Sequence, residues 1–574
     1  MRMDENFSRL NAAEAALVQA LRSAALRTAE ECGKELPEAL SFELERPRRA
    51  DQGDRASNVA MQLARAFSMP PRDIAARIAG SLQEGCRDLL DRVEVAGPGF
   101  INLFLSPRWF AEAASQVLQQ GERYGAVDMG HGRKVQVEFV SANPTGPLHI
   151  GHGRGAAVGD AVARILSFTG WNVEREYYLN DAGLQIETLG RSAQARYFEV
   201  CGKSELAPLP EDGYKGDYLL ELAEQIRKEE GDRFLATPLA ESLPWFERYA
   251  ADQILDGIRK DLERFGVLFD SWFSEASLYE RDQVSHAIED LKERGYAFEA
   301  NGALWFKSTA FADDKDRVLI RSNGVPTYFA SDVAYHHDKF VRRGFDRVID
   351  VWGADHHGYV PRMEAAVEAM GRAPGDFKAL LIQLVSLKRD GKLVGMSTRA
   401  GEFVTLKEVL DEVGVDATRF FFLMRRSDSQ LDFDLDLAKK QSSDNPVYYL
   451  QYAHARISSI LREWEGRGGD AAELRRDGTP LPDLLFDNKD ARALAETLAV
   501  FPVEMAGASV DLAPHMVAAY ALNLAGAFHS FYNTNRILGE SAEVEHGRLR
   551  LAEAVRIVLA TCLGLLGVSA PERM

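Results

Sequence analysis

Two histidines three residues apart, His149 and His152, stand between the pattern of a strand and the pattern of a helix. Residues 135–139 carry the β-branched and aromatic side chains of a buried parallel strand, and apolar residues at helical spacing then continue to Gly170. A helix that begins at the carboxyl end of a strand directs unpaired N–H groups and its positive dipole end into the crevice above the sheet. Gly151 has no side chain to keep a purine ring away, and two imidazoles can donate hydrogen bonds to phosphate oxygens. The spacing predicts a nucleotide-binding loop, and a helix cap or a metal-binding pair is the alternative for a bare H-x-x-H.

A second strand pattern, residues 348–352, also ends in small and hydrogen-bonding residues. Gly353, Asp355, His356 and His357 follow it directly. Ligand sites of open α/β sheets lie at the carboxyl ends of the strands, so this cluster predicts a second part of the same binding site. The paired histidines could instead ligate a metal, but no acidic third ligand stands at a recognisable spacing. We therefore predict no bound metal.

These strands belong to a long stretch of alternating strand and helix patterns, residues 113–424. The alternation predicts an α/β fold with a doubly wound, Rossmann-like parallel sheet that is interrupted by a charge-rich helical insertion. Before it, residues 1–112 show helical patterns followed by strand patterns, which predicts a small α+β domain. After it, residues 425–574 carry helical patterns almost throughout, which predicts an all-α domain. A chain of 574 residues is long enough for these three domains.

The composition is that of an ordinary soluble protein, with 46% apolar residues, 27% charged residues and a net charge of −19. The negative charge argues against general nucleic-acid affinity, although an acidic protein can still hold RNA through local basic faces. The four cysteines are scattered without a C-x-x-C pair, so neither a zinc site nor a disulfide framework is indicated. The N-terminus lacks the apolar segment of a signal peptide, and the longest apolar run, residues 557–568, is too short to span a bilayer. We therefore expect a cytoplasmic protein that does not contact a membrane.

The string from Glu138 to His152 resembles the HIGH signature of class I aminoacyl-tRNA synthetases, and specifically that of the arginyl-tRNA synthetase family. The resemblance covers nearly the whole chain and is most specific at residues 138–152, 328–332 and 353–357. It implies that ATP and L-arginine form arginyl-adenylate and pyrophosphate, and that the arginyl group then moves to the 3′ end of its cognate tRNA with release of AMP. It also implies Mg²⁺ with ATP as co-substrate, no tightly bound metal or prosthetic group, the arginine isoacceptors of tRNA as partner, and a monomer.

The resemblance places ATP between the two strand ends. His149 and His152 would stabilise the pentacoordinate phosphate, which is an electrostatic rather than an acid–base role. Gly353 would let the ribose approach, Asp355 would accept hydrogen bonds from its hydroxyls, and His356 would line the adenine pocket. The implied ATP-binding residues are His149, Gly151, His152, Gly353, Asp355, His356, Met396 and Ser397.

The guanidinium of arginine is planar and always charged, so a site for it needs carboxylates that face inward. The resemblance places Tyr328 and Asp332 at the guanidinium and lets Gln383 help to close the pocket. It places Asn143 and Glu138 at the α-amino group and backbone end. The division of roles between the two acids stays open, and a surface or cap role is the alternative for either acid taken alone.

The second class I signature, KMSKS, is altered in this chain, which reads GMSTRAG at residues 395–401. Both expected lysines are missing, and the stretch before HIGH carries no lysine that would replace them. The positive charge on the pyrophosphate leaving group must then come from elsewhere, with Arg399 as first choice and Lys392 or Lys388 as second. A catalytically silent tRNA-binding paralogue is the competing explanation.

The substitution Arg399→Ala is expected to slow adenylate formation far more than it weakens arginine binding, because the lost charge acts on the leaving group. Separate measurements of pyrophosphate exchange and of arginine binding check this, and an unchanged turnover would remove Arg399 from the role.

The outer domains resemble the tRNA-binding parts of the same family, with the N-terminal domain docking at the D-loop and the C-terminal domain at the anticodon. Aromatic side chains can stack on unpaired bases, and amides and arginines can hydrogen-bond to their edges. Core packing is the alternative for each aromatic residue. A class I synthetase of different amino-acid specificity is the alternative for the chain as a whole. The implied tRNA-binding residues are Phe100, Asn102, Tyr452, Arg456, Tyr532 and Asn535.

Overall fold

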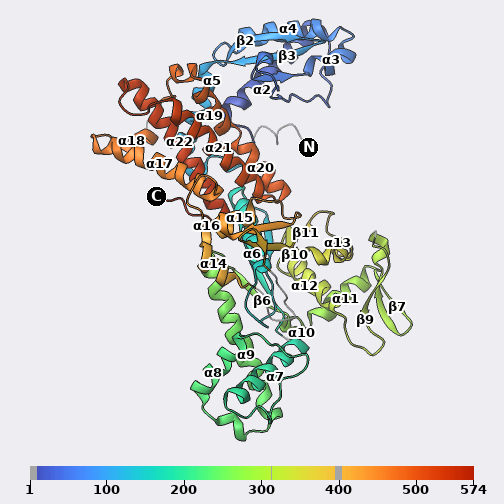
Figure 1. The fold of residues 1–574 in the computed structure, drawn as a ribbon. Helices are drawn as coiled ribbons and strands as arrows, with labels where there is room; N and C mark the ends of the chain where they lie inside the picture. Colours follow the sequence, from blue (N-terminus) through green and yellow to red (C-terminus); the bar gives the residue numbers. More distant parts are fainter. Residues whose placement is uncertain (1–8, 182, 312, 395–403, 477) are drawn as a thin grey trace.

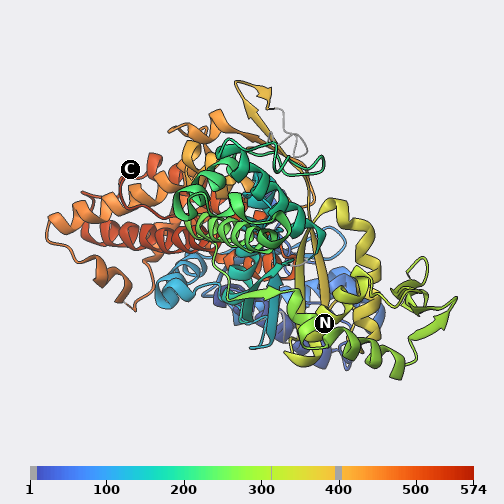
Figure 2. The same ribbon diagram turned by 90° about the horizontal axis from the view of Figure 1, so that it is seen from below.

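Three parts of the chain follow one another in space as they do in sequence (Figure 1). They are an N-terminal α+β part, a central part built around a parallel sheet, and a C-terminal helical part. In Figure 2 the C-terminal helices extend to one side of the molecule and the segment around residues 297–320 extends to the opposite side. The structure, a computed structural model, describes residues 9–181, 183–311, 313–394, 404–476 and 478–574.

The central sheet is built from five parallel strands: β4 (Lys134–Glu138), β5 (Asn172–Leu179), β6 (Ser271–Ser274), β10 (Arg347–Gly353) and β11 (Phe377–Ile382). Their order is β11-β10-β4-β5-β6. The first strand therefore lies in the middle, and the chain winds to one edge before it returns to build the other. The reversal between β4 and β10 is the switch point at which doubly wound sheets bind ligands. The predicted fold class is confirmed.

Helix α6 (Ile150–Phe168) follows β4 and ends just before Gly170, which has a φ of +83°. The helix packs tightly on the middle of the sheet, because a Cβ at Gly159 would lie 2.2 Å from the ring of Phe139. Only glycine allows an approach this close. The packing holds the first turn of α6 at the carboxyl end of β4, beside the switch point.

Two excursions leave the sheet. The predicted helical insertion lies between β5 and β6 and has its own buried core around Leu189, Tyr197 and Phe246. The second excursion, between β6 and β10, contains a small antiparallel sheet that the sequence patterns did not predict, because each of its strands has only four residues. The elements of the first are α7 (Leu184–Val200), α8 (Tyr218–Glu230) and α9 (Leu239–Arg264). Those of the second are α10 (Ala276–Glu280), α11 (Gln283–Glu293), β7 (Ala297–Ala300), β8 (Ala303–Phe306), β9 (Arg317–Ile320), α12 (Tyr328–His337) and the π-helical turn η5 (Asp338–Arg342).

The end of the central part returns to the sheet edge. After β10 come the short turn η6 (Ala354–Tyr359) and α13 (Val360–Ala369), and β11 leads into β12 (Val385–Arg389) and β13 (Lys392–Leu393). Strand β12 pairs with β13 and also with β14 (Leu431–Asp434), which follows the predicted boundary at residue 424. The helices here are α14 (Leu406–Val413), α15 (Val415–Leu423) and α16 (Leu435–Lys439).

From Pro446 onward the described residues form helices, as predicted. The stretch Lys489–Asp511 is long and apolar enough to cross a membrane by length and composition, but 67% of its most apolar window is buried inside the protein. It spans two helices that pack on their neighbours. The C-terminal helices are α17 (Pro446–Gly466), α18 (Ala471–Arg476), α19 (Lys489–Ala499), α20 (Phe501–Asp511), α21 (Pro514–Thr534) and α22 (Ala542–Leu566).

The N-terminal part has the predicted order of helices and strands and a three-stranded antiparallel sheet, β1-β3-β2. Ile101 and Leu103 on the middle strand have no exposed surface, so one face of this sheet forms the core. The elements are α2 (Ala12–Glu31), β1 (Arg55–Ser57), α3 (Val59–Phe67), α4 (Pro71–Gly85), β2 (Leu90–Ala96), β3 (Phe100–Leu105) and α5 (Pro107–Gln120).

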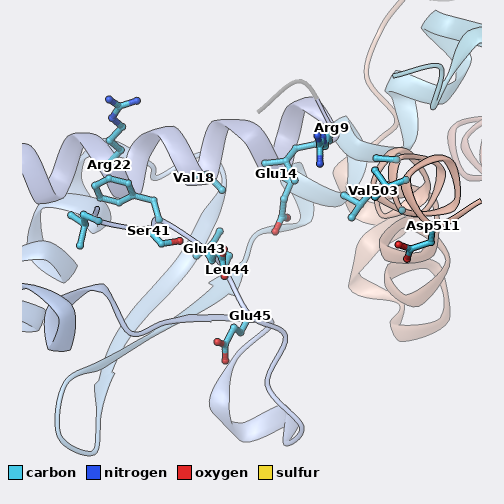
Figure 3. A pocket seen from close by; sticks show the side chains of 16 residues that line it. Arg9, Glu14, Val18, Arg22, Ser41, Glu43, Leu44, Glu45, Val503 and Asp511 are labelled. Atoms are coloured by element: carbon cyan, nitrogen blue, oxygen red, sulfur yellow. The ribbon is translucent and has the colours of Figure 1, made fainter. Parts of the chain in front are cut away.

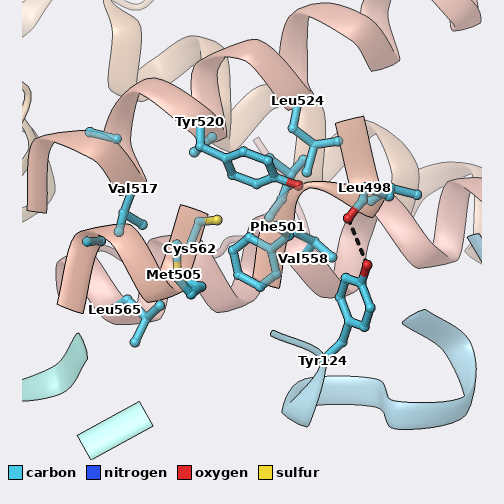
Figure 4. Close-up of a cluster of buried hydrophobic side chains, with 14 of the residues drawn as sticks. Tyr124, Leu498, Phe501, Met505, Val517, Tyr520, Leu524, Val558, Cys562 and Leu565 are labelled. Carbon is cyan, nitrogen blue, oxygen red and sulfur yellow. Dashed lines mark hydrogen bonds between the residues drawn. The ribbon is translucent and has the colours of Figure 1, made fainter. Parts of the chain in front are cut away.

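This part docks on the C-terminal helices rather than standing alone (Figure 1). The buried guanidinium of Arg55 lies between two carboxylates, donating to Glu14 at 2.8 Å and to Glu496 of α19 at 3.1 Å. Beside it, the hydroxyl of Tyr124 donates to the carbonyl of Leu498 at 2.9 Å, as Figure 4 shows. Residues more than 350 positions apart in sequence thus share one polar junction.

A cavity of about 510 Å³ lies along this junction, between α2, residues 40–45 and α20 (Figure 3). Val18, Leu40 and Val503 give it a mostly apolar lining, with Glu14 and Arg9 at one side. It is remote from the switch point of the sheet and contains none of the predicted site residues.

Candidate functional site

A pocket of about 380 Å³ opens at the switch point, where β4 and β10 end. It brings together five residues that the sequence singled out, and they come from β4, α12 and the turn after β10. Tyr328 is largely exposed at its rim, with 76% of its surface accessible, whereas Asp332 lies deeper, one helical turn further along α12. The five predicted residues are Glu138, Tyr328, Asp332, Gly353 and His356, and their neighbours in the wall include Ser141, Tyr178, Asp350, Trp352 and Tyr359.

The carboxylate of Asp332 is the acid best placed to receive a cationic group. The hydroxyl of Tyr359 donates to its Oδ2, and Oδ1 has no hydrogen-bond partner within the described part of the chain. Burial raises the pKa of Asp332 to about 6, although the Tyr359 hydrogen bond and His336 oppose the increase. A buried carboxylate with an open oxygen favours a ligand that brings its own positive charge and donors.

Glu138 is held by a strained turn directly after β4. Val140 and Ser141 have φ values of +69° and +42°, which β-branched and other non-glycine residues rarely adopt. The turn folds the Ser141 hydroxyl back, so that it donates to Glu138 Oε1 at 2.9 Å and accepts from the Tyr178 N–H at 3.1 Å. Burial raises the pKa of Glu138, and the ammonium of Lys339 opposes that increase.

A buried cation lies behind these acids, and the sequence patterns did not reveal it. Lys339 Nζ donates to Glu138 Oε2 at 2.6 Å and to Asp350 Oδ1 at 2.9 Å. His336 completes the group, with Nε2 at 3.0 Å from Asp350 Oδ2. The spacing of Asp332, His336 and Lys339 puts all three on one face of a helix, which is the signal that could have indicated them. Burial acts against ionisation of Asp350, but Lys339 and His336 outweigh it and lower the pKa of this acid to about 2.

A second ion pair supports the same region from β5. Glu176, whose side chain is fully buried, accepts from Arg343 Nη2 at 2.9 Å and from Gln136 Nε2 at 3.0 Å, and also from the hydroxyl of Tyr335. Burial acts to raise the pKa of Glu176, but the guanidinium of Arg343 prevails, so that its pKa is lowered. The pocket is therefore backed by cations while its open side is lined by carboxylates.

The HIGH loop forms the N-terminal cap of α6, as the sequence alternative allowed. Nδ1 of His149 accepts the N–H groups of Gly151 at 3.1 Å and of His152 at 3.4 Å. Nδ1 of His152 in turn accepts the N–H of His149 at 3.3 Å, and the two rings are stacked 3.7 Å apart. Because Nδ1 is the acceptor, a neutral ring carries its proton on Nε2. Burial lowers the pKa of His149, and burial together with His149 lowers that of His152 to about 3. Both rings are thus neutral hydrogen-bond donors at pH 7.

The chain after the GMSTR segment runs beside the HIGH loop. The Ile150 N–H donates to the Val404 carbonyl at 3.3 Å, and the Leu406 N–H donates to the Leu148 carbonyl at 2.8 Å. Met396, Ser397 and Arg399 lie outside the described residues. Of the other candidate cations, Lys388 is engaged by Asp432 at 2.6 Å, whereas Lys392 is exposed on β13.

Three predicted residues lie outside the wall of this pocket. The Asn143 amide donates to Gln185 Oε1 at 2.5 Å, and Gln383 follows β11, where its carbonyl accepts from Arg154 at 2.9 Å. Asp355 is exposed just after Gly353, and a Cβ on that glycine would lie 2.4 Å from the Asp355 carboxylate. These residues surround the crevice at the end of the sheet rather than lining the pocket at its switch point.

The predicted tRNA contacts of the N-terminal part share one face of β3. Phe100 is 37% exposed at the start of the strand. Asn102, two residues on, is buried between β1 and β2. Phe104 continues this face, with the guanidinium of Arg92 3.7 Å from its ring centre.

On the C-terminal part, three of the four predicted residues meet at a surface between α17 and α21. The guanidinium of Arg456 lies 5.4 Å from the ring centre of Tyr452 and 5.1 Å from that of Tyr532. Sequence patterns missed His529, whose ring is stacked on Tyr452 at 5.9 Å. Asn535 does not join them, because it is buried and accepts from Asn488 at 3.0 Å at the start of α19.

Comparisons with known proteins agree over the whole length of the chain. Family models match residues 11–105 as the arginyl tRNA synthetase N terminal domain, 113–432 as the catalytic domain of tRNA synthetases class I (R), and 450–574 as the DALR anticodon binding domain. The Arginine--tRNA ligase of Syntrophotalea carbinolica is 55% identical over 92% of this chain and 94% of its own length. That of Geobacillus kaustophilus is 49% identical over 96% and 98%. The Thermus thermophilus arginyl-tRNA synthetase structure has the same fold, with a TM-score of 0.72 at 24% identity over 97% of this chain and all of that one.

Proposed function

The chain belongs to the arginyl-tRNA synthetase family, and we propose that it joins L-arginine to the 3′ end of its cognate tRNA at the switch point of its central sheet. ATP and arginine give arginyl-adenylate and pyrophosphate, and transfer of the arginyl group to tRNA releases AMP. The observation that carries the proposal is the buried Asp332 carboxylate, with one oxygen open toward a pocket that other carboxylates line. The comparisons do not favour a silent paralogue or a synthetase for another amino acid.

Arginine would enter this pocket with its guanidinium on Asp332 and its α-ammonium toward Glu138. Tyr328 would cover the guanidinium from the rim, and Asn143 and Gln383 would close the pocket from the loops around it. Two carboxylates facing two cationic groups of one ligand explain why this site suits arginine better than a neutral side chain.

ATP would lie beside it, over the N-terminus of α6. His149 and His152, as neutral donors, would hold the phosphate where negative charge develops. Gly151 and Gly353 would leave room for the adenosine, with Asp355 and His356 near the ribose and base. Mg²⁺ would accompany the triphosphate, since the donors that this loop offers are imidazoles and N–H groups, which suit phosphate oxygens rather than the ion.

A cation near the leaving group would replace the missing lysines of KMSKS. Arg399 remains the first candidate, because it precedes Val404 by a few residues and Val404 touches the HIGH loop. Lys392 is the second, since Lys388 is engaged by Asp432. Met396 and Ser397 would contact ATP from the same segment.

The tRNA would contact both outer parts. Phe100, with Asn102 on the same strand face, would dock the D-loop. The surface of Tyr452, Arg456 and Tyr532 would stack anticodon bases. Asn535 would act on that surface only through the helix end that it fixes. We further infer a cytoplasmic monomer that does not bind a membrane.

Charging of unfractionated tRNA with labelled amino acids, in the presence of ATP and Mg²⁺, tests the function. We expect arginine alone to be transferred. Pyrophosphate exchange with and without tRNA, measured in parallel, shows whether activation depends on tRNA. Charging with another amino acid, or tRNA binding without any charging, would contradict the proposal.

A further inference from the structure

The buried ammonium of Lys339 has no role in the function proposed so far. Its side chain has no exposed surface and its Nζ lies between two carboxylates, with the ring of Tyr335 4.1 Å away. Those carboxylates, Glu138 and Asp350, are directly paired positions on the neighbouring parallel strands β4 and β10. Two like charges so close together in a buried site cannot both stay ionised without a cation between them. Lys339 supplies that cation.

The geometry also fixes which way the two acids face. Glu138 and Asp350 both line the pocket, whereas Lys339 does not. The ammonium therefore lies behind them, and Ser141 holds the other oxygen of Glu138. The side of the pocket open to a ligand presents negative charge, in an orientation that rigid neighbours determine.

A purely structural role explains this arrangement poorly. A buried ion pair contributes little net stability compared with well-packed apolar residues of similar volume. Lys339 also stands on the π-helical turn η5, an irregularity that is frequent at functional sites. The turn points Lys339 toward the strand ends that bind the ligand.

We propose that Lys339 is a positioning residue for arginine recognition, which holds Glu138 and Asp350 ionised and facing the α-ammonium end of the bound amino acid. The inference rests on the proposed function of the pocket. Lys339 acts through the carboxylates and does not touch the substrate.

The proposal predicts a change in pH dependence as well as in affinity. The charged and titratable groups that face the ammonium are Glu138 from β4, Glu176 from β5, Asp350 from β10, and Tyr335, His336 and Arg343 from α12 and η5. Without the ammonium, protonation of Glu138 or Asp350 becomes easier. The acid limb of arginine binding should then move to higher pH, which a loss of packing alone would not cause.

Calorimetric titration of L-arginine into the full chain, with and without tRNA, tests this. K339M is expected to bind arginine roughly 10- to 100-fold more weakly, the factor for losing one hydrogen bond to a charged group. K339R keeps the charge and should stay closer to the wild type. R55M is the matched control, because Arg55 is also a buried cation between two carboxylates but lies at the distant N-terminal junction. It should bind arginine like the wild type, with an unmoved acid limb.

The double variant K339M/D350N addresses a failure of K339M to fold, because it removes the repulsion between the two acids. Its affinity should stay at least about tenfold below the wild type, since nothing then holds Glu138. Wild-type affinity in K339M or in the double variant, or equal losses in K339M and R55M, would overturn the inference. So would a wild type that binds no arginine. A wild type that binds arginine but charges no tRNA would contradict only the proposed function.

Discussion

The substitution D332N is expected to weaken L-arginine binding about 10²- to 10³-fold, the range for removing one member of a buried, hydrogen-bonded charge pair. The asparagine keeps the size of the side chain and can still accept from Tyr359, so the pocket should keep its shape. The KM for ATP should change by less than about twofold, because Asp332 faces the amino-acid side. Calorimetric titration and the two KM values measure these effects.

The pH dependence of the same variant separates loss of charge from loss of shape. With a pKa of about 6, Asp332 is ionised at pH 7.5 and mostly protonated at pH 5. Because the guanidinium binds the ionised form, wild-type affinity should fall about tenfold between these values, one factor of ten per pH unit below the pKa. D332N should lack this limb.

Y359F provides the matched control for Asp332. It keeps the carboxylate but removes the hydrogen bond that lowers its pKa, so the limb should move to higher pH. Arginine binding by D332N at the wild-type level, or a wild-type affinity that does not change from pH 7.5 to pH 5, would exclude Asp332 as the guanidinium ligand.

The substitution H152N is expected to slow arginyl-adenylate formation about 10²- to 10³-fold, the usual loss for one donor to a developing charge. The asparagine oxygen takes the place of Nδ1 and can still accept the His149 N–H, which preserves the cap of α6. What is lost is the Nε2–H group. The KM for arginine and the thermal unfolding midpoint should therefore stay close to the wild type.

H152Q tests the same assignment from the other side, because its amide nitrogen can replace the Nε2–H donor. It should recover part of the lost rate. With the pKa of His152 at about 3, kcat at saturating arginine should show no titration of this ring between pH 5.5 and 8. Equal rates for H152N and H152Q, or a limb near pH 6.5 that disappears in H152Q, would indicate acid–base catalysis instead.

The elements that hold the site could be predicted from sequence because their signals are local. Strands β4 and β10 follow from short apolar runs, and α6 follows from spacing that ends at Gly170. Glu138 and Asp332 could be proposed because the ligand must be matched by carboxylates, and the structure places both in one pocket.

The partners of those acids could not be predicted, because they depend on contacts between distant segments. Lys339 reaches Glu138 across 201 positions of sequence, and no local pattern encodes that contact. Asn535 shows the reverse case. Its amide and the aromatic residues near it suggested a surface for bases, but the fold uses it to join α21 to α19. The strained turn at Val140 likewise has no signal in residue type, since valine normally avoids this conformation.

The junction around Arg55 also constrains how the chain can be made. Glu496, one of its two carboxylate partners, is 441 positions further along. At a synthesis rate of about 5–20 residues per second, the N-terminal domain waits roughly 20–90 s for that partner to leave the ribosome. During this interval the face that will meet α19 and α20 is bare, and the guanidinium lacks half of its counter-charge. The newborn chain is therefore most exposed to aggregation and proteolysis at the end that is finished first.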